Sequence, residues 1–216
     1  MLCSIAIHRI DTAREDVYLA SVDDQEAVIA QSDAFQGRTV MRSQLEHGVF
    51  WLVDEWTDLD SMQMALAAAR TLASVAALVE EPRELLTAGE ELARRPSADV
   101  DGLEEMAPFF LIAEGWVKLP CLDEYLDTLR HQGQALVDEP GFLRRLLLAD
   151  REGELHYYVI DQWAGERPAY ESYQRRQVSQ EEAMLFLSLF AERGKPMMAT
   201  GVKIPKRTTL EAQRWR

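Results

Sequence analysis

Two strand-like stretches in the second half of the chain carry side chains that could transfer a proton. The stretch "FFLIAEGWVKL" (109–119) contains Glu114 and Trp116, and "ELHYYVIDQW" (154–163) contains a histidine, aromatic residues and an aspartate. Successive side chains of a strand point to opposite faces, so Glu114 and Trp116 share one face. The same alternation divides the second stretch into two sets: His156, Tyr158 and Gln162 on one face, and Tyr157, Asp161 and Trp163 on the other. Only one face of each strand can line a cavity, and the alternation does not say which one.

Each of the two titratable candidates also has a plainer interpretation. A carboxylate in an apolar strand, such as Glu114, either faces solvent or is held in a cavity where it could act as a base. A strand histidine, such as His156, either serves as a base or is hydrogen-bonded and partly exposed. The sequence leaves both alternatives open.

The aromatic candidates could frame an apolar pocket or fill the core. Trp56 and Trp163 are either core residues between sheet and helix or platforms for a flat ligand. Tyr170 and Tyr173 lie three residues apart on one face of a predicted helix, which fits core packing as well as a pocket wall.

The stretch "FWLVDEW" (50–56) recurs as "YYVIDQW" (157–163), 107 positions later. With this offset and no gap, identical residues coincide at further positions: Asp16 with Asp123, Tyr18 with Tyr125, Leu19 with Leu126, Gln25 with Gln132, Phe35 with Phe142, and Arg38 with Arg145. A shared register of about 40 residues indicates an internal duplication. The paired arginines either form matched salt bridges, which is the expected role, or hold an anion.

The second copy reads as strand, helix, strand, strand, helix, strand. After "FFLIAEGWVKL", Pro120 ends the first strand, and leucines at helical spacing predict a helix that ends at a Pro-Gly pair. Two strands, "FLRRLLLAD" and "ELHYYVIDQW", follow as a hairpin joined by "REG". A helix over 166–193 and a last strand in "MMATGVKI" complete the order βαββαβ.

The first copy repeats this order less clearly. It predicts a strand in "LCSIAIHRI", a helix over about 15–32, strands near 38–44 and 49–56, and an Ala-rich helix that Asp58 or Asp60 can cap. The fourth strand is ambiguous, because "RELLTAG" (83–89) suits a strand or a helix.

The element order predicts an α+β fold. Each βαββαβ unit makes an antiparallel sheet with both helices on one face, the ferredoxin-like arrangement. Because both faces of the strands are largely apolar, we expect the two sheets to pack face to face as an intrachain dimeric α+β barrel. We assign 1–95 to the first repeat, 96–107 to a linker, 108–205 to the second repeat and 206–216 to a basic C-terminal tail.

Composition argues against several classes of protein. A formal net charge of -14 disfavours nucleic acid, and no apolar run approaches the ~20 residues of a membrane helix. The N-terminus lacks a secretion signal, and Cys3 and Cys121 have no CxxC partner, so we expect a cytoplasmic protein. Motifs for nucleotide binding, zinc hydrolysis and serine hydrolysis are missing from the sequence, and its histidines are scattered.

The second copy resembles the antibiotic biosynthesis monooxygenase family of dimeric α+β barrels. The resemblance rests on a strand, a helix, a Pro-Gly-Phe entry to the second strand at 140–142, and a third strand that ends in Trp163 before the next helix. The first copy matches more loosely, because it keeps Phe35 and Trp56 but has Asp-Ala at 33–34. The pattern is more specific for fold than for activity.

Family members with known activity include cofactor-independent oxygenases that convert polycyclic phenols or anthrones to quinones, and relatives that degrade haem. The haem-degrading branch pairs an Asn with a His beyond the Trp, whereas this sequence contains no Asn and no His after His156. A cofactor-free oxygenase needs a dry aromatic pocket, a proton acceptor and donors to an oxyanion. The resemblance thus implies as catalytic residues Trp163, Glu114 and His156, and as substrate-binding residues Trp116, Tyr157, Tyr158, Asp161, Tyr170 and Tyr173.

The expected function is therefore a cofactor-independent monooxygenase that acts on a small aromatic substrate, polyphenol-like or anthrone-like, in a barrel pocket. We expect no cofactor and no metal. The expected partner is the aromatic ligand, and we expect no binding to nucleic acid or to a membrane. The alternative is a non-catalytic barrel that binds a small molecule or is purely structural. Because the fusion of two copies removes the need to dimerise, we expect a monomer or a homodimer.

Overall fold

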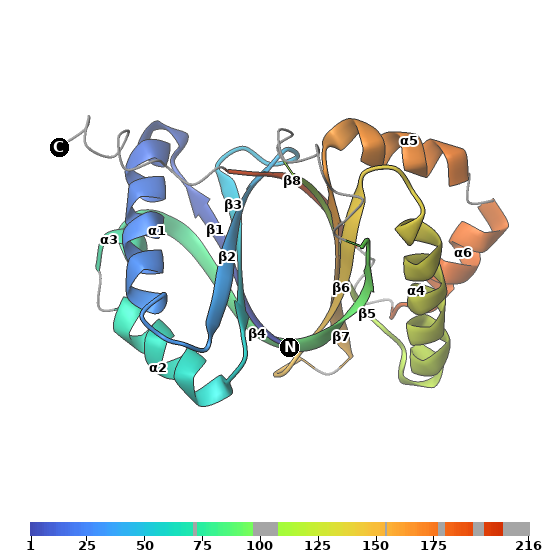
Figure 1. The fold of residues 1–216 in the computed structure, drawn as a ribbon, viewed down its shortest axis with the longest axis horizontal. Coiled ribbons are helices and arrows are strands. Elements are labelled where there is room, and N and C mark those ends of the chain that lie inside the picture. Colours follow the sequence, from blue (N-terminus) through green and yellow to red (C-terminus); the bar gives the residue numbers. More distant parts are fainter. Residues whose placement is uncertain (71–72, 97–107, 154, 177–179, 192–196, 205–216) are drawn as a thin grey trace. The chain divides into compact units, whose positions relative to one another are not determined.

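The computed structural model describes residues 1–70, 73–96, 108–153, 155–176, 180–191 and 197–204 (Figure 1). The predicted tail 206–216 and the predicted linker 96–107, apart from Pro96, lie outside these described residues. The described chain divides into two compact units. Unit 1 contains Met1–Leu85 together with Lys203 and Ile204, and unit 2 contains Leu86–Val202.

Unit 1 is built on an antiparallel sheet whose central strand is β3. The strands are β1 (Leu2–Ile10), β2 (Phe35–Ser43) and β3 (Val49–Trp56), and β3 pairs with both of the others. The helical elements are η1 (Thr12–Arg14), α1 (Glu15–Ile29), α2 (Leu59–Arg70) and α3 (Ala73–Ala76). These helices lie on one side of the sheet (Figure 1).

Unit 2 repeats this plan with more strands. Its sheet has the order β8, β5, β7, β6, β4, with strands β5 (Phe109–Trp116), β6 (Phe142–Asp150), β7 (His156–Trp163) and β8 (Met197–Lys203). The helical elements are η3 (Leu119–Cys121), α4 (Leu122–Val137), α5 (Glu166–Arg176) and α6 (Gln180–Ser188). The predicted α+β class, with an antiparallel sheet and helices on one face in each copy, is confirmed.

The ambiguous segment near "RELLTAG" is a strand. β4 runs over Val79–Arg94, and its residues Thr87–Arg94 pair with β6 of unit 2. The strand therefore continues from unit 1 into unit 2. Its Glu and Leu residues favoured a helix as much as a strand, and pairing with β6, which lies far away in the sequence, decides the outcome.

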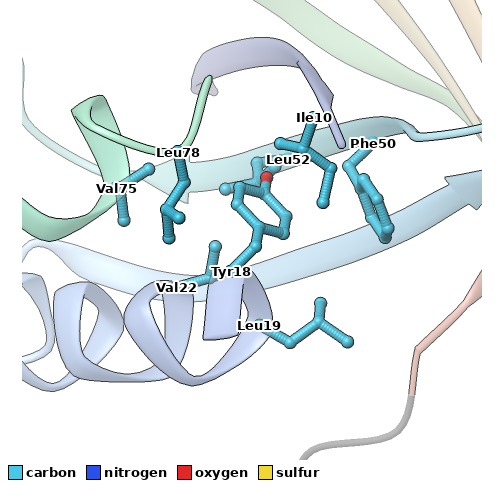
Figure 2. Close-up of a cluster of buried hydrophobic side chains, with 8 residues drawn as sticks. All are labelled: Ile10, Tyr18, Leu19, Val22, Phe50, Leu52, Val75 and Leu78. Atoms are coloured by element: carbon cyan, nitrogen blue, oxygen red, sulfur yellow. The ribbon is translucent and has the colours of Figure 1, made fainter. Parts of the chain in front are cut away.

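The core of unit 1 lies between α1 and β3. Figure 2 shows Tyr18 projecting from α1 into a cluster of apolar side chains that includes Phe50 and Leu52 of β3. The rings of Tyr18 and Phe50 are 5.0 Å apart, and both residues are fully buried. Burial of each such side chain contributes about 1.5–3 kcal/mol, which holds the helix on the sheet.

The buried His8 of β1 should make the stability of the protein depend on pH. Its Nδ1 lies 2.9 Å from the hydroxyl of Tyr18. Burial lowers the pKa of His8 from 6.5 to about 4, outweighing the raising effect of Glu84. The unfolded chain therefore binds the proton of His8 near pH 6.5, and the folded chain binds it only near pH 4. As a result, the free energy of unfolding is not reduced by His8 above pH 6.5 and falls as the pH drops from 6.5 toward 4.

We expect the wild type to lose about 2 kcal/mol more unfolding free energy than His8→Gln when the pH falls from roughly 7 to 4.5. Glutamine can still bond to the Tyr18 hydroxyl but does not titrate. Urea unfolding at the two pH values measures the difference. Equal losses in the two proteins would show that His8 does not carry this part of the pH dependence.

Gly141 of the Pro-Gly-Phe sequence adopts a backbone conformation that favours glycine. It has φ +80°, and a Cβ atom there would lie 2.6 Å from Cβ of Pro168 at the start of α5. Its carbonyl accepts the amide of Ala164 at 2.7 Å, which joins the entry of β6 to the end of β7.

We expect Gly141→Ala to lower the unfolding free energy by at least about 1–2 kcal/mol, because the substitution adds backbone strain and a steric clash. Chemical denaturation would measure the loss. The exposed neighbour Pro140→Ala, which removes no positive φ, serves as the control. A Gly141→Ala protein as stable as the control would contradict this role for Gly141.

Candidate functional site

The structure decides which face of the unit 2 sheet meets the helices. Asp161 pairs with Arg145, whose Nη1 donates to the Leu129 carbonyl of α4 at 3.4 Å. Tyr157 packs on Tyr125 of α4 at 5.6 Å between ring centroids. The face with Tyr157, Asp161 and Trp163 is therefore the helix-covered face, and Glu114, Trp116, His156 and Tyr158 lie on the opposite face.

The opposite face carries a buried polar cluster, defined by Glu114, Asp150, His156 and Tyr158. The Tyr158 hydroxyl donates to Oε1 of Glu114 at 3.1 Å, and Nε2 of His156 lies 3.0 Å from the same oxygen. Nδ1 of His156 lies 3.0 Å from Oδ2 of Asp150. The side chains of Glu114 and His156 are each 3% exposed, and that of Asp150 is 8% exposed. A carboxylate, an imidazole and a phenol thus share one desolvated site.

Strand register brings these side chains together. Glu114 pairs with Tyr158, and Trp116 pairs with His156, between β5 and β7. The Trp116 and His156 rings are stacked, with centroids 4.0 Å apart and planes 1° apart. The stack fixes the plane of the imidazole ring, so that its two nitrogens point toward the two carboxylates.

Asp150 is the member of the cluster that sequence reasoning missed. It ends β6 just before the turn into β7, and this hairpin position opposite His156 was the available signal. Burial alone would raise the pKa of Asp150, but hydrogen bonds from the Glu152 amide, His156 and the Gly153 amide together lower the pKa. Asp150 is therefore held in its ionised form.

Buried apolar side chains adjoin the polar cluster on the same face of the sheet. The side chains beside it in the strand register are buried and hydrophobic: Phe110 and Ile112 on β5, Leu146 and Leu148 on β6, and Ile160 on β7. These apolar side chains therefore surround the polar cluster on its own face of the sheet.

The remaining candidates lie apart from the cluster. Trp163 is 2% exposed and packs edge-on against Phe142 at 5.4 Å, with Ala169 of α5 in the same core cluster. Tyr170 and Tyr173 of α5 are 47% and 73% exposed. The structure therefore brings together Glu114, His156, Tyr158 and Trp116, and it does not bring Trp163, Tyr157, Asp161, Tyr170 or Tyr173 to them.

Comparison of the two copies separates shared features from those of unit 2 alone. The Trp56 and Trp163 indoles are both buried, and neither Nε1 has a hydrogen-bond partner among the described residues. Asp54 and Arg38 form the same two-pronged salt bridge as Asp161 and Arg145. The expected salt-bridge role of the paired arginines is thus confirmed, and these duplicated features serve the fold of both units.

The polar cluster is not duplicated. The offset of 107 places Ile7 of unit 1 opposite Glu114, Val49 opposite His156 and Trp51 opposite Tyr158. The strand register is conserved between the copies, since Ile7 pairs with Trp51 as Glu114 pairs with Tyr158. One copy therefore folds with apolar residues where the other buries a carboxylate, an imidazole and a phenol.

Two structural findings concern metals and membranes. Among the described ranges, no three His, Cys, Asp or Glu side chains are grouped so that they could hold a metal ion. Within the same part of the chain, no helix has the length and apolar character that a membrane crossing requires.

The chain is similar in fold to several solved structures. It matches a protein from Fusobacterium nucleatum, provisionally described as a monooxygenase, with a TM-score of 0.74 and 10% identity over 96% of this chain and 94% of that one. An anthrone oxidase-like protein matches with a TM-score of 0.66 and 16% identity over 95% and 92%. A haem-degrading enzyme from Listeria monocytogenes matches with a TM-score of 0.54 and 9% identity over 92% and 98%. At these identities the likeness concerns the fold alone.

Sequence comparison identifies a family in the second half of the chain. No curated protein matches the sequence. Residues 108–181 match the family model described as antibiotic biosynthesis monooxygenase. The resemblance predicted for the second copy is thereby confirmed over residues 108–181, and the chain has the fold of the solved structures described above.

Proposed function

We propose that the protein is a cofactor-independent monooxygenase acting on a small aromatic substrate, polyphenol-like or anthrone-like, and that the polar cluster of unit 2 carries the reaction. The observation that supports this most is the buried group of Glu114, His156 and Tyr158 among apolar side chains. Burial of these groups opposes folding unless their hydrogen bonds compensate it. Unit 1 shows that the fold does not need them.

The arrangement suits removal of a proton from an acidic phenol or from an activated CH₂ group. In the proposed reaction Glu114 accepts that proton, and His156 and Tyr158 supply donors near the negative charge that develops. The substrate anion then transfers one electron to O₂. The two radicals combine to a peroxide anion, which takes the proton back from Glu114. The resulting hydroperoxide loses water to leave a carbonyl. The sum is CH₂ + O₂ → C=O + H₂O, and the substrate provides all the electrons.

The alternative is a barrel protein without catalysis, in which the polar cluster binds a ligand or only stabilises the sheet. Buried networks can be structural when every group is satisfied. The copies argue against a purely structural role, because the same register is stable with Ile7, Val49 and Trp51 in the matched places.

Oxygen uptake by the purified protein, with chelator present, tests the proposal against a panel of anthrones and hydroxylated polycyclic aromatics. We expect uptake well above the rate without protein for at least one compound, with a quinone as product. Thermal-shift measurements on the same panel provide the second readout. Stabilisation without uptake would favour the ligand-binding alternative, and neither signal from folded protein would favour the structural one.

A further inference from the structure

Asp150 makes two kinds of contact at the turn from β6 into β7. Its Oδ1 accepts the backbone amide of Glu152 at 3.0 Å, which holds the turn. Its Oδ2 lies 3.0 Å from Nδ1 of His156, whose other ring nitrogen faces Glu114. The carboxylate thus connects the turn to the site.

Unit 1 shows which of these contacts the turn needs. The residue matched to Asp150 is Ser43, whose Oγ accepts the backbone amides of Leu45 and Glu46 at 3.2 and 3.1 Å. The residue matched to His156 is Val49. A serine is therefore sufficient to hold this turn, and the carboxylate in unit 2 has a separate role toward His156.

The two contacts of the His156 ring set the number of protons shared within the cluster. Both ring nitrogens of His156 lie 3.0 Å from carboxylate oxygens, one of Asp150 and one of Glu114. A bare nitrogen facing a carboxylate oxygen at this distance would place two acceptors against each other. Two protons must therefore be shared among the imidazole and the two carboxyl groups.

Three contacts favour both protons on the imidazole. The Tyr158 hydroxyl donates to Glu114, and the Glu152 amide donates to Asp150, and each bond favours the ionised carboxylate. The stacked indole of Trp116 favours a cation in the facing ring. The ring of His156 thus has the contacts of a double N–H donor between two carboxylates.

The turn leaves room for this arrangement at Gly153. A Cβ atom at Gly153 would lie 2.7 Å from Oδ2 of Asp150 and 3.2 Å from Cβ of His156. Any larger residue would displace the carboxylate or the histidine. Just before His156, Leu155 has φ 57°, and its carbonyl accepts the Val117 amide at 2.8 Å. The turn therefore holds a strained backbone where it presents His156 to β5.

We infer that Asp150 is a positioning residue of the site: it holds His156 as an imidazolium with Nε2–H directed at Glu114. The catalytic part of this inference rests on the proposed function. A fixed positive charge beside Glu114 would stabilise the negative charge that develops when the substrate loses its proton. Asp150 itself acts through His156.

The first test is the ¹⁵N spectrum of the His156 ring in the full chain at pH 7. We expect two protonated nitrogens in the wild type and one bare nitrogen in Asp150→Ser, which keeps the turn-holding hydroxyl found in unit 1. Gly153→Ala, which displaces Asp150 without removing it, should change the ring in the same direction. Circular dichroism confirms that each variant is folded. A bare nitrogen in the wild type, or an unchanged ring in folded Asp150→Ser, would overturn the inference.

The second test is oxygen uptake with any panel compound that the wild type oxidises. We expect Asp150→Ser to lower kcat on the order of tenfold to hundredfold and to shift the pH profile, with smaller losses in Asp150→Asn, whose amide oxygen can still accept Nδ1–H. Wild-type kcat and pH profile in Asp150→Ser would refute the positioning role. If the wild type consumes no oxygen, the proposed function fails, and the ring spectrum still decides whether Asp150 holds His156 as the cation.

Discussion

Replacement of Glu114 by glutamine is expected to lower the oxygen-uptake rate by about 10²–10⁴-fold, the range that a positioned general base contributes. Glutamine has nearly the same shape and can still accept the hydrogen bonds from Tyr158 and His156, which meet at Oε1 in the wild type. It cannot take a proton from the substrate. The loss should therefore appear in kcat, with the affinity for the aromatic compound largely kept.

Two controls separate this effect from damage to the fold. His131→Gln changes an exposed histidine on α4 and should leave the rate unchanged. His47→Gln changes an exposed histidine of unit 1 and should also leave the rate unchanged. Stopped-flow or electrode measurements of oxygen uptake, with thermal unfolding of each variant, provide the readout. A folded Glu114→Gln protein with the wild-type rate would rule out Glu114 as the base.

Removal of the Asp161 carboxylate is expected to cause the largest loss of stability. Asp161 binds Arg145 through two hydrogen bonds of 2.6 and 2.7 Å, and both side chains are about nine-tenths buried. Asp161→Ala leaves the guanidinium buried without its counter-charge, which costs about 3–5 kcal/mol. Urea unfolding monitored by tryptophan fluorescence should show this loss.

The duplication supplies a matched control for that prediction. Asp54 pairs with Arg38 in unit 1 with the same geometry, so Asp54→Ala should cause a loss of similar size. The double replacement Arg145→Met with Asp161→Leu should recover most of the stability, because no unpaired charge remains. A double variant as unstable as Asp161→Ala would show that the ion pair itself, and not the orphaned charge, sets the cost.

The order of the elements could be predicted from the sequence because it follows from local patterns. Alternating apolar residues in "YYVIDQW", leucines at helical spacing in the α4 segment and the Pro-Gly pair at its end all act within a few residues. The helix over 166–193 is less simple, because the structure has α5 and α6 on either side of 177–179, which lie outside the described residues. The segment "RELLTAG" is ambiguous in its local sequence, and its pairing with β6 decides that it is a strand.

The sequence also placed Glu114 and Trp116 on one face of their strand and His156 and Tyr158 on one face of theirs, because the period of a strand is two. Tertiary structure alone decided which faces are covered by helices, since that depends on where α4 and α5 pack. Asp150 lies in the site because the hairpin brings it beside His156. Trp163 lies outside the site because it packs toward α5. Periodicity names the residues that share a strand face, whereas a site requires contacts across strands, and those depend on register and packing over long sequence distances.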